Sequence, residues 1–499
     1  MIRTDQPNQW STKRAFRWGL LFLAVLAAAV RGFAPGVSSA QAVPAAPQSQ
    51  RPVNFVVFLA DDHGEGDLGS YGHAVLKTPN IDHLAAEGMR FDRAFLTISS
   101  CSPSRASILT GRYPHSTGAE DLHQPLPAGQ STFAYYLRQA GYHNMAVGKW
   151  HLGEAEKRNW DTVVDCDGRD TAAETLKALR DRPKDKPFFL WAASKDPHRP
   201  FDPAAIAEPY DPADVIVPPY LPDHPLIRED LALYYGEVTR FDQHVGLIRE
   251  ELEKQGLLDD TFVVYLSDNG MPFPRAKTTL YDSGIRTPLV VRFPRLVAPR
   301  GVQKNLFSVV DLVPTMLDVA GIKAPSAQGE SRLAMLKDQA APGRDAVHAE
   351  ANWHDFEQFT RAVRTDRFLL IRNYYWDKPL WNSVDSINSI TWKGFQQALR
   401  MGSLSPAQRF LLQQPRPFEE FYDLQVDPVS LNNVAEAGRY REDLNRLRTL
   451  LDNWRVETAD HMPAERRRDG WTRDGIPLPH NQPWYDDYVK AGRSNFERF

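Results

Sequence analysis

The chain has 499 residues, of which 42% are hydrophobic and 24% are charged, and its formal net charge is −4. This composition is that of an ordinary globular protein with one large or two smaller domains, and it excludes disordered and collagen-like chains. No run of five like charges occurs, so we expect no nucleic-acid partner, and an anionic ligand must meet a local pocket. Two cysteines, Cys101 and Cys166, are too few for a disulfide framework or a cysteine-rich zinc module.

The N-terminal region has the three parts of a secretory signal. Basic residues within positions 13–17 precede an apolar run at 18–30, and a small-x-small triplet at 40–42 offers a cleavage site. The apolar run is too short to span a membrane, so we expect residues 1–42 to be removed and no stable membrane anchor to remain, with an uncleaved anchor as the alternative. The sequence contains no Asn-x-Ser/Thr sequon, which favours an exported bacterial protein, periplasmic or secreted.

From residue 53 onward, short apolar runs alternate with helix-like stretches. This pattern predicts an α/β fold, with a large and mainly parallel sheet flanked by helices. Buried strands are predicted at residues 53–59, 144–147, 188–192 and 261–266. Residues 227–255 have apolar positions at helical spacing and a charged opposite face, so we expect a long helix with a structural role.

The character of the sequence changes after about residue 342. Apolar runs at 368–372 and 421–424, followed by a charged helix at 439–457, predict a smaller C-terminal α+β domain on an antiparallel sheet. The expected organisation is a Pro/Ala/Gln-rich linker at 43–52, a large domain at 53–342, the smaller domain at 343–457 and an extension at 458–499.

A polar cluster follows each of the four predicted strands. In chain order the clusters are Asp61 and Asp62, Lys149 to His151, Asp196 to Arg199, and Asp268 and Asn269. Ligands of open parallel sheets bind outside the carboxyl ends of the strands. We therefore expect these clusters, although distant in sequence, to converge on one side of the molecule.

Consecutive carboxylates at the end of a buried strand are unfavourable unless a cation compensates them. Asp61 and Asp62 are such a pair, and Asp268 and Asn269 add oxygen ligands after another strand. An all-oxygen set predicts Ca²⁺, with Mg²⁺ as the second choice, rather than zinc. The alternative is a helix cap and a turn, in which Asp and Asn are common.

A short helix is predicted to begin at Cys101, with Pro103 in its first turn and Gly111 past its end. Free amides at this end favour anionic ligands, and Arg105 adds a guanidinium suited to sulfate or phosphate oxygens. A thiolate nucleophile at Cys101 is expected to be stabilised there as well. The alternative is a buried structural cysteine.

The segment Cys101-x-Pro103-Ser104-Arg105-x-x-x-Leu109-Thr110-Gly111 resembles the signature of the type I sulfatases, the formylglycine-dependent branch of the alkaline phosphatase superfamily. Residues 141–151 are similar to the second signature of that family, apart from Asn144, where Ser or Thr is usual. The resemblance extends over roughly residues 52–435, including Tyr422-Asp423-Leu424. It implies an alkaline phosphatase-like sulfatase fold and a catalytic domain at 53–342.

The resemblance also implies a modified nucleophile and a partner that makes it. In the family the motif cysteine is oxidised to formylglycine by a maturation enzyme, so Cys101 is the expected position. The formylglycine hydrate supplies two hydroxyls. One hydroxyl attacks sulfur and forms a covalent sulfate ester. The other is then deprotonated, so that the aldehyde re-forms and sulfate is expelled. An ordinary Ser or Cys has no second hydroxyl and cannot release sulfate in this way.

Further roles are implied position by position. Ca²⁺ would be held by Asp61, Asp62, the modified Cys101, Asp268 and Asn269. The sulfate oxygens would be neutralised by Arg105, Lys149 and Lys277. His151 would assist deprotonation of the diol, and His198 would protonate the leaving group.

Four segments, at residues 122–124, 196–199, 210–215 and 267–274, resemble the sulfamidase branch, the heparan N-sulfatases. That branch cleaves the N–S bond of N-sulfoglucosamine, whose amine must be protonated to leave. Position 277 is Lys in this chain, whereas Arg is expected there in the sulfamidase branch. Lys keeps a positive charge for the sulfate but cannot bind it in the bidentate geometry of Arg. Substrate contacts are proposed from proximity to the motifs at His123, Asp196, Arg199 and His354.

Three other functions stay open. The core motifs equally serve an O-sulfatase of glycosaminoglycans or other sulfated polysaccharides. A phosphodiesterase or phosphonate hydrolase of the same superfamily is a weaker alternative, and a carbohydrate-binding relative without activity is another if Cys101 is never converted. A sulfated saccharide is the expected substrate, and resemblance alone implies a homodimer.

Overall fold

The structure is a computed structural model that describes residues 52–166, 168–380 and 382–466. The predicted signal at 1–42, the predicted linker except its last residue, and most of the predicted extension at 458–499 lie outside the described residues. Across the described residues, no helix combines the length and the apolar character that crossing a membrane requires.

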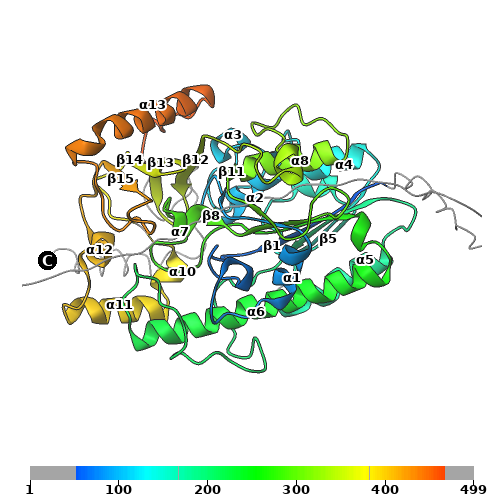
Figure 1. The fold of residues 1–499 in the computed structure, drawn as a ribbon, viewed down its shortest axis with the longest axis horizontal. Coiled ribbons are helices and arrows are strands. Elements are labelled where there is room, and N and C mark those ends of the chain that lie inside the picture. Colours follow the sequence, from blue (N-terminus) through cyan, green and yellow to red (C-terminus); the bar gives the residue numbers. More distant parts are fainter. Residues whose placement is uncertain (1–51, 167, 381, 467–499) are drawn as a thin grey trace, which may run out of the picture. The chain divides into compact units, whose positions relative to one another are not determined.

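A sheet of eight strands organises the region that carries the polar clusters (Figure 1). In spatial order its strands are β10 (Gly301–Gln303), β2 (Met89–Phe91), β9 (Leu289–Arg292), β7 (Thr261–Ser267), β1 (Asn54–Ala60), β6 (Phe188–Ala193), β4 (His143–Gly148) and β5 (Thr162–Val164). All neighbouring strands are parallel except for β9, which is antiparallel to both β7 and β2. The predicted mainly parallel sheet is confirmed, and the four predicted strands correspond to β1, β4, β6 and β7.

Helices cover both faces of this sheet because the side chains of each central strand alternate between two cores. In β1, Phe55, Val57 and Leu59 belong to one core, while Val56 and Phe58 belong to the other. The first core is covered by α2 (Cys101–Thr110), α4 (Phe133–Gln139) and α8 (Leu312–Val319). The second is covered by α1 (Pro79–Glu87), α5 (Gly168–Asp181) and α6 (Pro225–Lys254). The predicted long helix is confirmed as α6.

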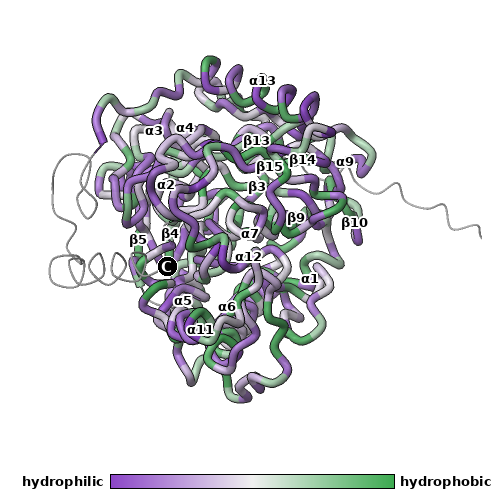
Figure 2. Tube along the Cα trace, turned by 90° about the vertical axis from the view of Figure 1, so that its left-hand side faces the viewer, coloured by the Kyte–Doolittle hydropathy of each residue, from purple (hydrophilic) through white to green (hydrophobic). Residues whose placement is uncertain are grey.

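A four-stranded antiparallel sheet follows in the C-terminal region, in the order β12 (Ala346–Trp353), β13 (Glu357–Thr365), β14 (Phe368–Asn373) and β15 (Glu419–Asp423). Helix α13 (Arg441–Glu457) packs on this sheet through Leu444, Leu447, Leu451 and Trp454, which recur at helical spacing. Figure 2 shows hydrophilic and hydrophobic residues alternating along α13. The predicted C-terminal α+β fold is confirmed, while the boundary at residue 342 stays a prediction.

The chain between β14 and β15 returns to α6, the long helix that covers one face of the eight-stranded sheet. It contains α10 (Val384–Ile387) and α11 (Ile390–Arg400), and α11 packs along α6 (Figure 1). The remaining short elements include a three-stranded sheet of β11 (Phe307–Ser308), β3 (Ala94–Phe95) and β8 (Arg286–Thr287), and the helices α3 (Pro114–Thr117), α7 (Asp282–Ile285), α9 (Leu333–Lys337) and α12 (Pro406–Arg409). The return path matters because it carries Asp385, at the start of α10, to the edge of the large sheet.

Candidate active site

The four predicted polar clusters meet at one edge of the large sheet. Strands β7, β1, β6 and β4 are consecutive parallel neighbours, so their carboxyl ends lie side by side. A cavity of about 890 Å³ opens there, and Asp61, Lys149 and His198 line it from three different strand ends. Gly148 makes the turn into this cavity possible, since at its φ of +94° a Cβ would lie 1.9 Å from the carbonyl oxygen of Ala193.

An acidic group lies at the floor of this site. One oxygen each of Asp61, Asp62 and Asp268 lies within 4.8 Å of the other two, and all three residues are fully buried. Asp61 Oδ1 and Asn269 Oδ1 are buried acceptors without a hydrogen-bond partner among the described residues. Unpaired buried acceptors are unfavourable, and an all-oxygen set is what Ca²⁺ and Mg²⁺ prefer. The residues present therefore fit a divalent cation.

Three basic side chains surround the acidic group. Lys149 Nζ contacts Asp61 Oδ2, and Lys277 Nζ lies 2.8 Å from Asp62 Oδ2. Arg105 is fully buried, and its Nε lies 2.8 Å from Asp268 Oδ2. In this arrangement each carboxylate has at least one basic partner, and Asp61 has a second in Arg105 at 3.7 Å, so an added cation leaves these basic groups available to an anion.

Burial governs the ionisation of the acidic group. It raises the pKa of Asp62 to about 7, with Lys277 acting in the opposite direction. Burial and the neighbouring Asp61 raise the pKa of Asp268 to about 7. For Asp61, burial is outweighed by Lys149 and the other cationic groups, which hold its pKa well below the ordinary value. A bound divalent cation favours the ionised form of all three carboxyls.

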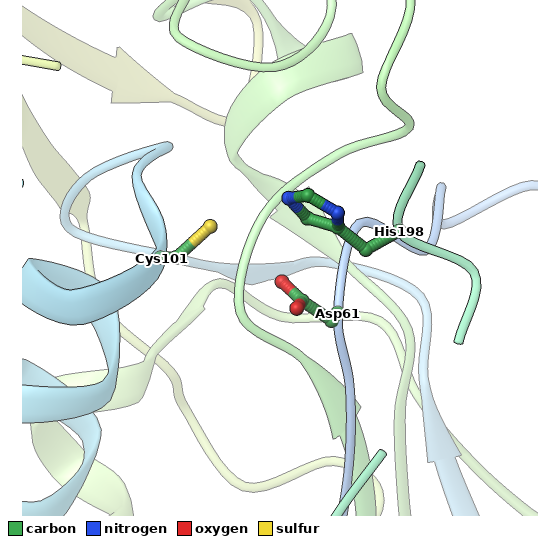
Figure 3. Close-up of side chains that lie close together, drawn as sticks. All are labelled: Asp61, Cys101 and His198. Carbon is green, nitrogen blue, oxygen red and sulfur yellow. The ribbon is translucent and has the colours of Figure 1, made fainter. Parts of the chain in front are cut away.

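Cys101 is the first residue of α2 and is 2% exposed. Its sulfur lies within 4.8 Å of a carboxylate oxygen of Asp61 and of a ring nitrogen of His198, and Figure 3 shows these three side chains pointing toward a common space. Burial raises the pKa of the Cys101 thiol well above its ordinary value, although Lys149 and Lys277 oppose this. Burial thus outweighs the nearby positive side chains and favours the neutral thiol, while stabilisation of a thiolate by the helix end stays a prediction.

His198 presents one defined nitrogen to the cavity. Its Nδ1 is hydrogen-bonded to the backbone carbonyl of Arg199, and since a carbonyl only accepts, Nδ1 carries the proton. Its Nε2 lies 3.9 Å from Asp62 Oδ2 and 3.6 Å from Asp385 Oδ2. Burial and the two nearby lysines lower the pKa of His198 to about 3, so the ring is neutral in the absence of an anionic ligand.

His151 is paired with His123. Nε2 of His151 lies 2.6 Å from Nδ1 of His123, and the other ring nitrogen of His151 is buried with no hydrogen-bond partner among the described residues. Burial, with Lys149, lowers the pKa of His151 well below its ordinary value, which keeps the ring neutral. Both residues adopt left-handed backbone conformations, with φ of 52° for His151 and 64° for His123. Such strained conformations cluster at functional sites.

The four predicted substrate contacts all line the cavity. Asp196 accepts hydrogen bonds from Arg240 at 2.7 and 2.8 Å, and Arg199 donates to Asp230 at 2.6 and 2.8 Å. His354 Nδ1 lies 2.7 Å from Ser100 Oγ. Asp196 and Arg199 thus hold ion pairs within the chain, and contact with a substrate stays a prediction for all four residues.

Sequence reasoning missed Asp385. Its Oδ2 lies 2.7 Å from Lys277 Nζ, and the residue lines the same cavity as Cys101. The sequence around it contains no motif, because an Asp in the first turn of a short helix is common. Its proximity to Lys277 follows from the return of the chain between β14 and β15, which the sequence does not reveal.

Comparison with known proteins agrees with this geometry. Residues 53–322 match the family model described as Sulfatase, and residues 275–389 match the model described as N-sulphoglucosamine sulphohydrolase, C-terminal. The chain is 33% identical over 460 residues to human N-sulphoglucosamine sulphohydrolase, covering 82% of this chain and 91% of that protein. It is 30% identical over 468 residues to an ulvan-active sulfatase of Formosa agariphila, covering 82% and 76%.

A solved structure supports the fold assignment independently. It is described as a complex with its substrate D-glucosamine-2-N,6-O-disulfate, and it has a TM-score of 0.66 at 22% identity, covering 84% of this chain and 100% of the other. At this identity the likeness concerns the fold alone. Together with the family models, it confirms the resemblance and the fold predicted from the Cys101 signature. The chain belongs to the sulfatase family, and the protein is an enzyme that hydrolyses a sulfate or sulfamate.

Proposed function

We propose that the protein removes sulfate from a sulfated sugar, and that it is an N-sulfoglucosamine sulfohydrolase acting on heparan sulfate or heparin fragments. The observation that carries the proposal is the position of His198, whose Nε2 faces the cavity while a backbone carbonyl holds Nδ1. An amine is a poor leaving group and needs a proton donor in this place. The similarity to human N-sulphoglucosamine sulphohydrolase along most of the chain supports the same substrate.

The proposal includes a metal and a modified residue. Ca²⁺, with Mg²⁺ as the second choice, would be held by Asp61, Asp62, Asp268, Asn269 and the side chain at position 101. The cation supplies Lewis acidity, and formylglycine made from Cys101 supplies the nucleophilic hydroxyl. A formylglycine-generating enzyme is therefore a required partner.

The other roles in the proposed reaction are assigned to basic and histidine side chains of the cavity. Lys149 and Lys277 line the cavity and would bind the sulfate oxygens, with the buried charge of Arg105 behind them. Because Nδ1 already carries a proton, His198 can donate only after Nε2 takes up a second one, which the negative charge of a bound sulfate favours. That proton would pass to the leaving atom. His151, neutral and with one unpartnered nitrogen among the described residues, would accept a proton on the nucleophile side.

Export to the periplasm or beyond is also part of the proposal, on the strength of the N-terminal signal pattern. A homodimer stays a prediction that size-exclusion chromatography with light scattering can check.

The substrate is tested by sulfate release from N-sulfoglucosamine and from glucosamine 6-sulfate. The protein used should have its formylglycine content at residue 101 verified by peptide mass. We expect release from the N-sulfated sugar. Release from the 6-sulfate alone would replace the sulfamidase assignment with an O-sulfatase, a second candidate that the 30% identity to an ulvan-active sulfatase favours. If neither sugar releases sulfate, the proposed substrate class is contradicted.

Neutralising one metal ligand should weaken cation binding without unfolding the protein. In the Asp268→Asn variant, the site loses a charge while the side-chain volume is kept, so Ca²⁺ affinity falls. Calorimetric titration with Ca²⁺ measures this directly, and a saturating cation at about 100 times its Kd should stabilise only the wild type, by roughly 2.7 kcal/mol. Asp366→Asn, which alters a carboxylate that is 70% exposed, is the matched control. Equal Ca²⁺ binding by Asp268→Asn would disprove the metal site.

A further inference from the structure

We propose that Asp385 makes the site select an N-sulfate over an O-sulfate, by accepting a hydrogen bond from the nitrogen that links sulfur to the sugar. The inference rests on the proposed sulfamidase function and names the residue that produces its specificity.

Asp385 lies beside the nitrogen that would protonate the leaving group. Its Oδ2 lies 3.6 Å from His198 Nε2 and 2.7 Å from Lys277 Nζ. Its Oδ1 accepts a hydrogen bond of 2.7 Å from the backbone N–H of Ser386, which holds the carboxylate in place. The side chain is 19% exposed and lines the cavity, so a ligand can reach it.

The presence of this carboxylate needs an explanation, because it lies in a cavity that must receive an anion. Lys277 contacts a second carboxylate, Asp62 at 2.8 Å, so Asp385 is not its only acidic partner. A second negative charge there weakens the attraction of Lys277 for a sulfate group. This loss of affinity is offset if Asp385 itself binds a hydrogen-bond donor of the substrate.

The two classes of substrate differ in one such donor. The bridging atom of a sulfamate is a nitrogen that carries a hydrogen, whereas the bridging oxygen of a sulfate ester carries lone pairs only. An ionised carboxylate only accepts hydrogen bonds, so it attracts the N–H and repels the ester oxygen. The bridging atom must come within hydrogen-bond distance of His198 Nε2, and this places it next to Asp385 Oδ2.

The same carboxylate favours the product of N–S cleavage. When the N–S bond breaks, its electron pair stays on nitrogen, which takes the proton from Nε2 of the doubly protonated His198 ring and becomes an amine, leaving that ring neutral. The full reaction converts a sulfamate monoanion and water into an ammonium ion and a sulfate dianion. A nitrogen that gains hydrogens and positive charge is stabilised by an adjacent carboxylate through a charge-assisted hydrogen bond, while a leaving alcohol stays neutral.

A matched pair of sugars tests the inference. N-sulfoglucosamine and glucose 2-sulfate differ only in the bridging N–H or O, and kcat/KM is measured for both with wild type and Asp385→Asn. We expect the ratio of the N-sulfate to the O-sulfate value to fall by about 10- to 100-fold in the variant, the range of a hydrogen bond to a charged group. Asp377→Asn, on the same segment but 52% exposed and paired with Arg466, should leave the ratio unchanged.

The outcomes distinguish a failure of the inference about Asp385 from a failure of the proposed function. If Asp385→Asn lowers both kcat/KM values by the same factor, Asp385 only positions Lys277 and the inference is overturned. If wild-type enzyme releases no sulfate from N-sulfoglucosamine, the proposed function fails and the inference fails with it. The smaller variant Asp385→Ser repeats the measurement should Asp385→Asn not fold, with the same ratio expected.

Discussion

Replacing Cys101 with Ala should abolish sulfate release while the protein stays folded. The side chain is buried at the first turn of α2, where Ala is compatible with a helix, so the structural effect is small. The chemical effect is large, because loss of a covalent nucleophile in a hydrolase reduces kcat by about 10⁶-fold. Sulfate release is measured by ion chromatography, with circular dichroism to monitor the fold.

The second cysteine provides the control for this experiment. Cys166 is partly exposed and has Thr171 as its side-chain neighbour, outside every motif of the family. Cys166→Ala should retain wild-type kcat, because no step of the proposed chemistry uses this sulfur. Wild-type activity in Cys101→Ala would show that residue 101 is not the nucleophile.

Replacing His198 with Ala should reduce the hydrolysis of N-sulfoglucosamine by about 10² to 10⁴-fold, the usual contribution of a general acid. The reason is the geometry of the ring, whose Nδ1 is bound to the Arg199 carbonyl and whose Nε2 faces the cavity. Nitrophenyl sulfate has a leaving group that departs as a stable anion, so its hydrolysis should decrease much less. The measurement is kcat/KM for both substrates.

A histidine on the protein surface provides the control for this experiment. His83 is 53% exposed and contacts Glu87, so His83→Ala should change neither value. Equal losses on both substrates in His198→Ala would show that His198 positions other groups and does not protonate the leaving atom.

The strands and helices can be predicted because the sequence pattern that indicates each one lies within its own residues. Strand β1 is apolar from Phe55 to Ala60, and such runs are typical of strands that are buried on both faces. The spacing of Leu444, Leu447 and Leu451 in α13 likewise identifies a helix with one buried side. The order of the strands is not local, and neither is the antiparallel orientation of β9.

The ionisation of Cys101 shows where local reasoning fails. The positive end of α2 and the nearby lysines suggest a lowered pKa, and the two lysines do act in that direction. Complete burial has the larger effect, and burial depends on every element that packs around the site. The unmodified thiol is therefore a poor nucleophile here, which agrees with the proposed conversion of Cys101 to formylglycine.

The sequence by itself determined the fold class, the family and the residues at the strand ends. It could do so because parallel strands place their carboxyl ends together, and because the residues that follow each strand are adjacent to it in the chain. The tertiary structure alone decided that Asp385 joins Asp62 beside His198, since Asp385 reaches the cavity on a segment between two strands of the other sheet. It also decided that Asp196 and Arg199 are held by Arg240 and Asp230 of α6. Contacts of this kind arise from the packing of elements that are far apart in the chain, and no local pattern encodes them.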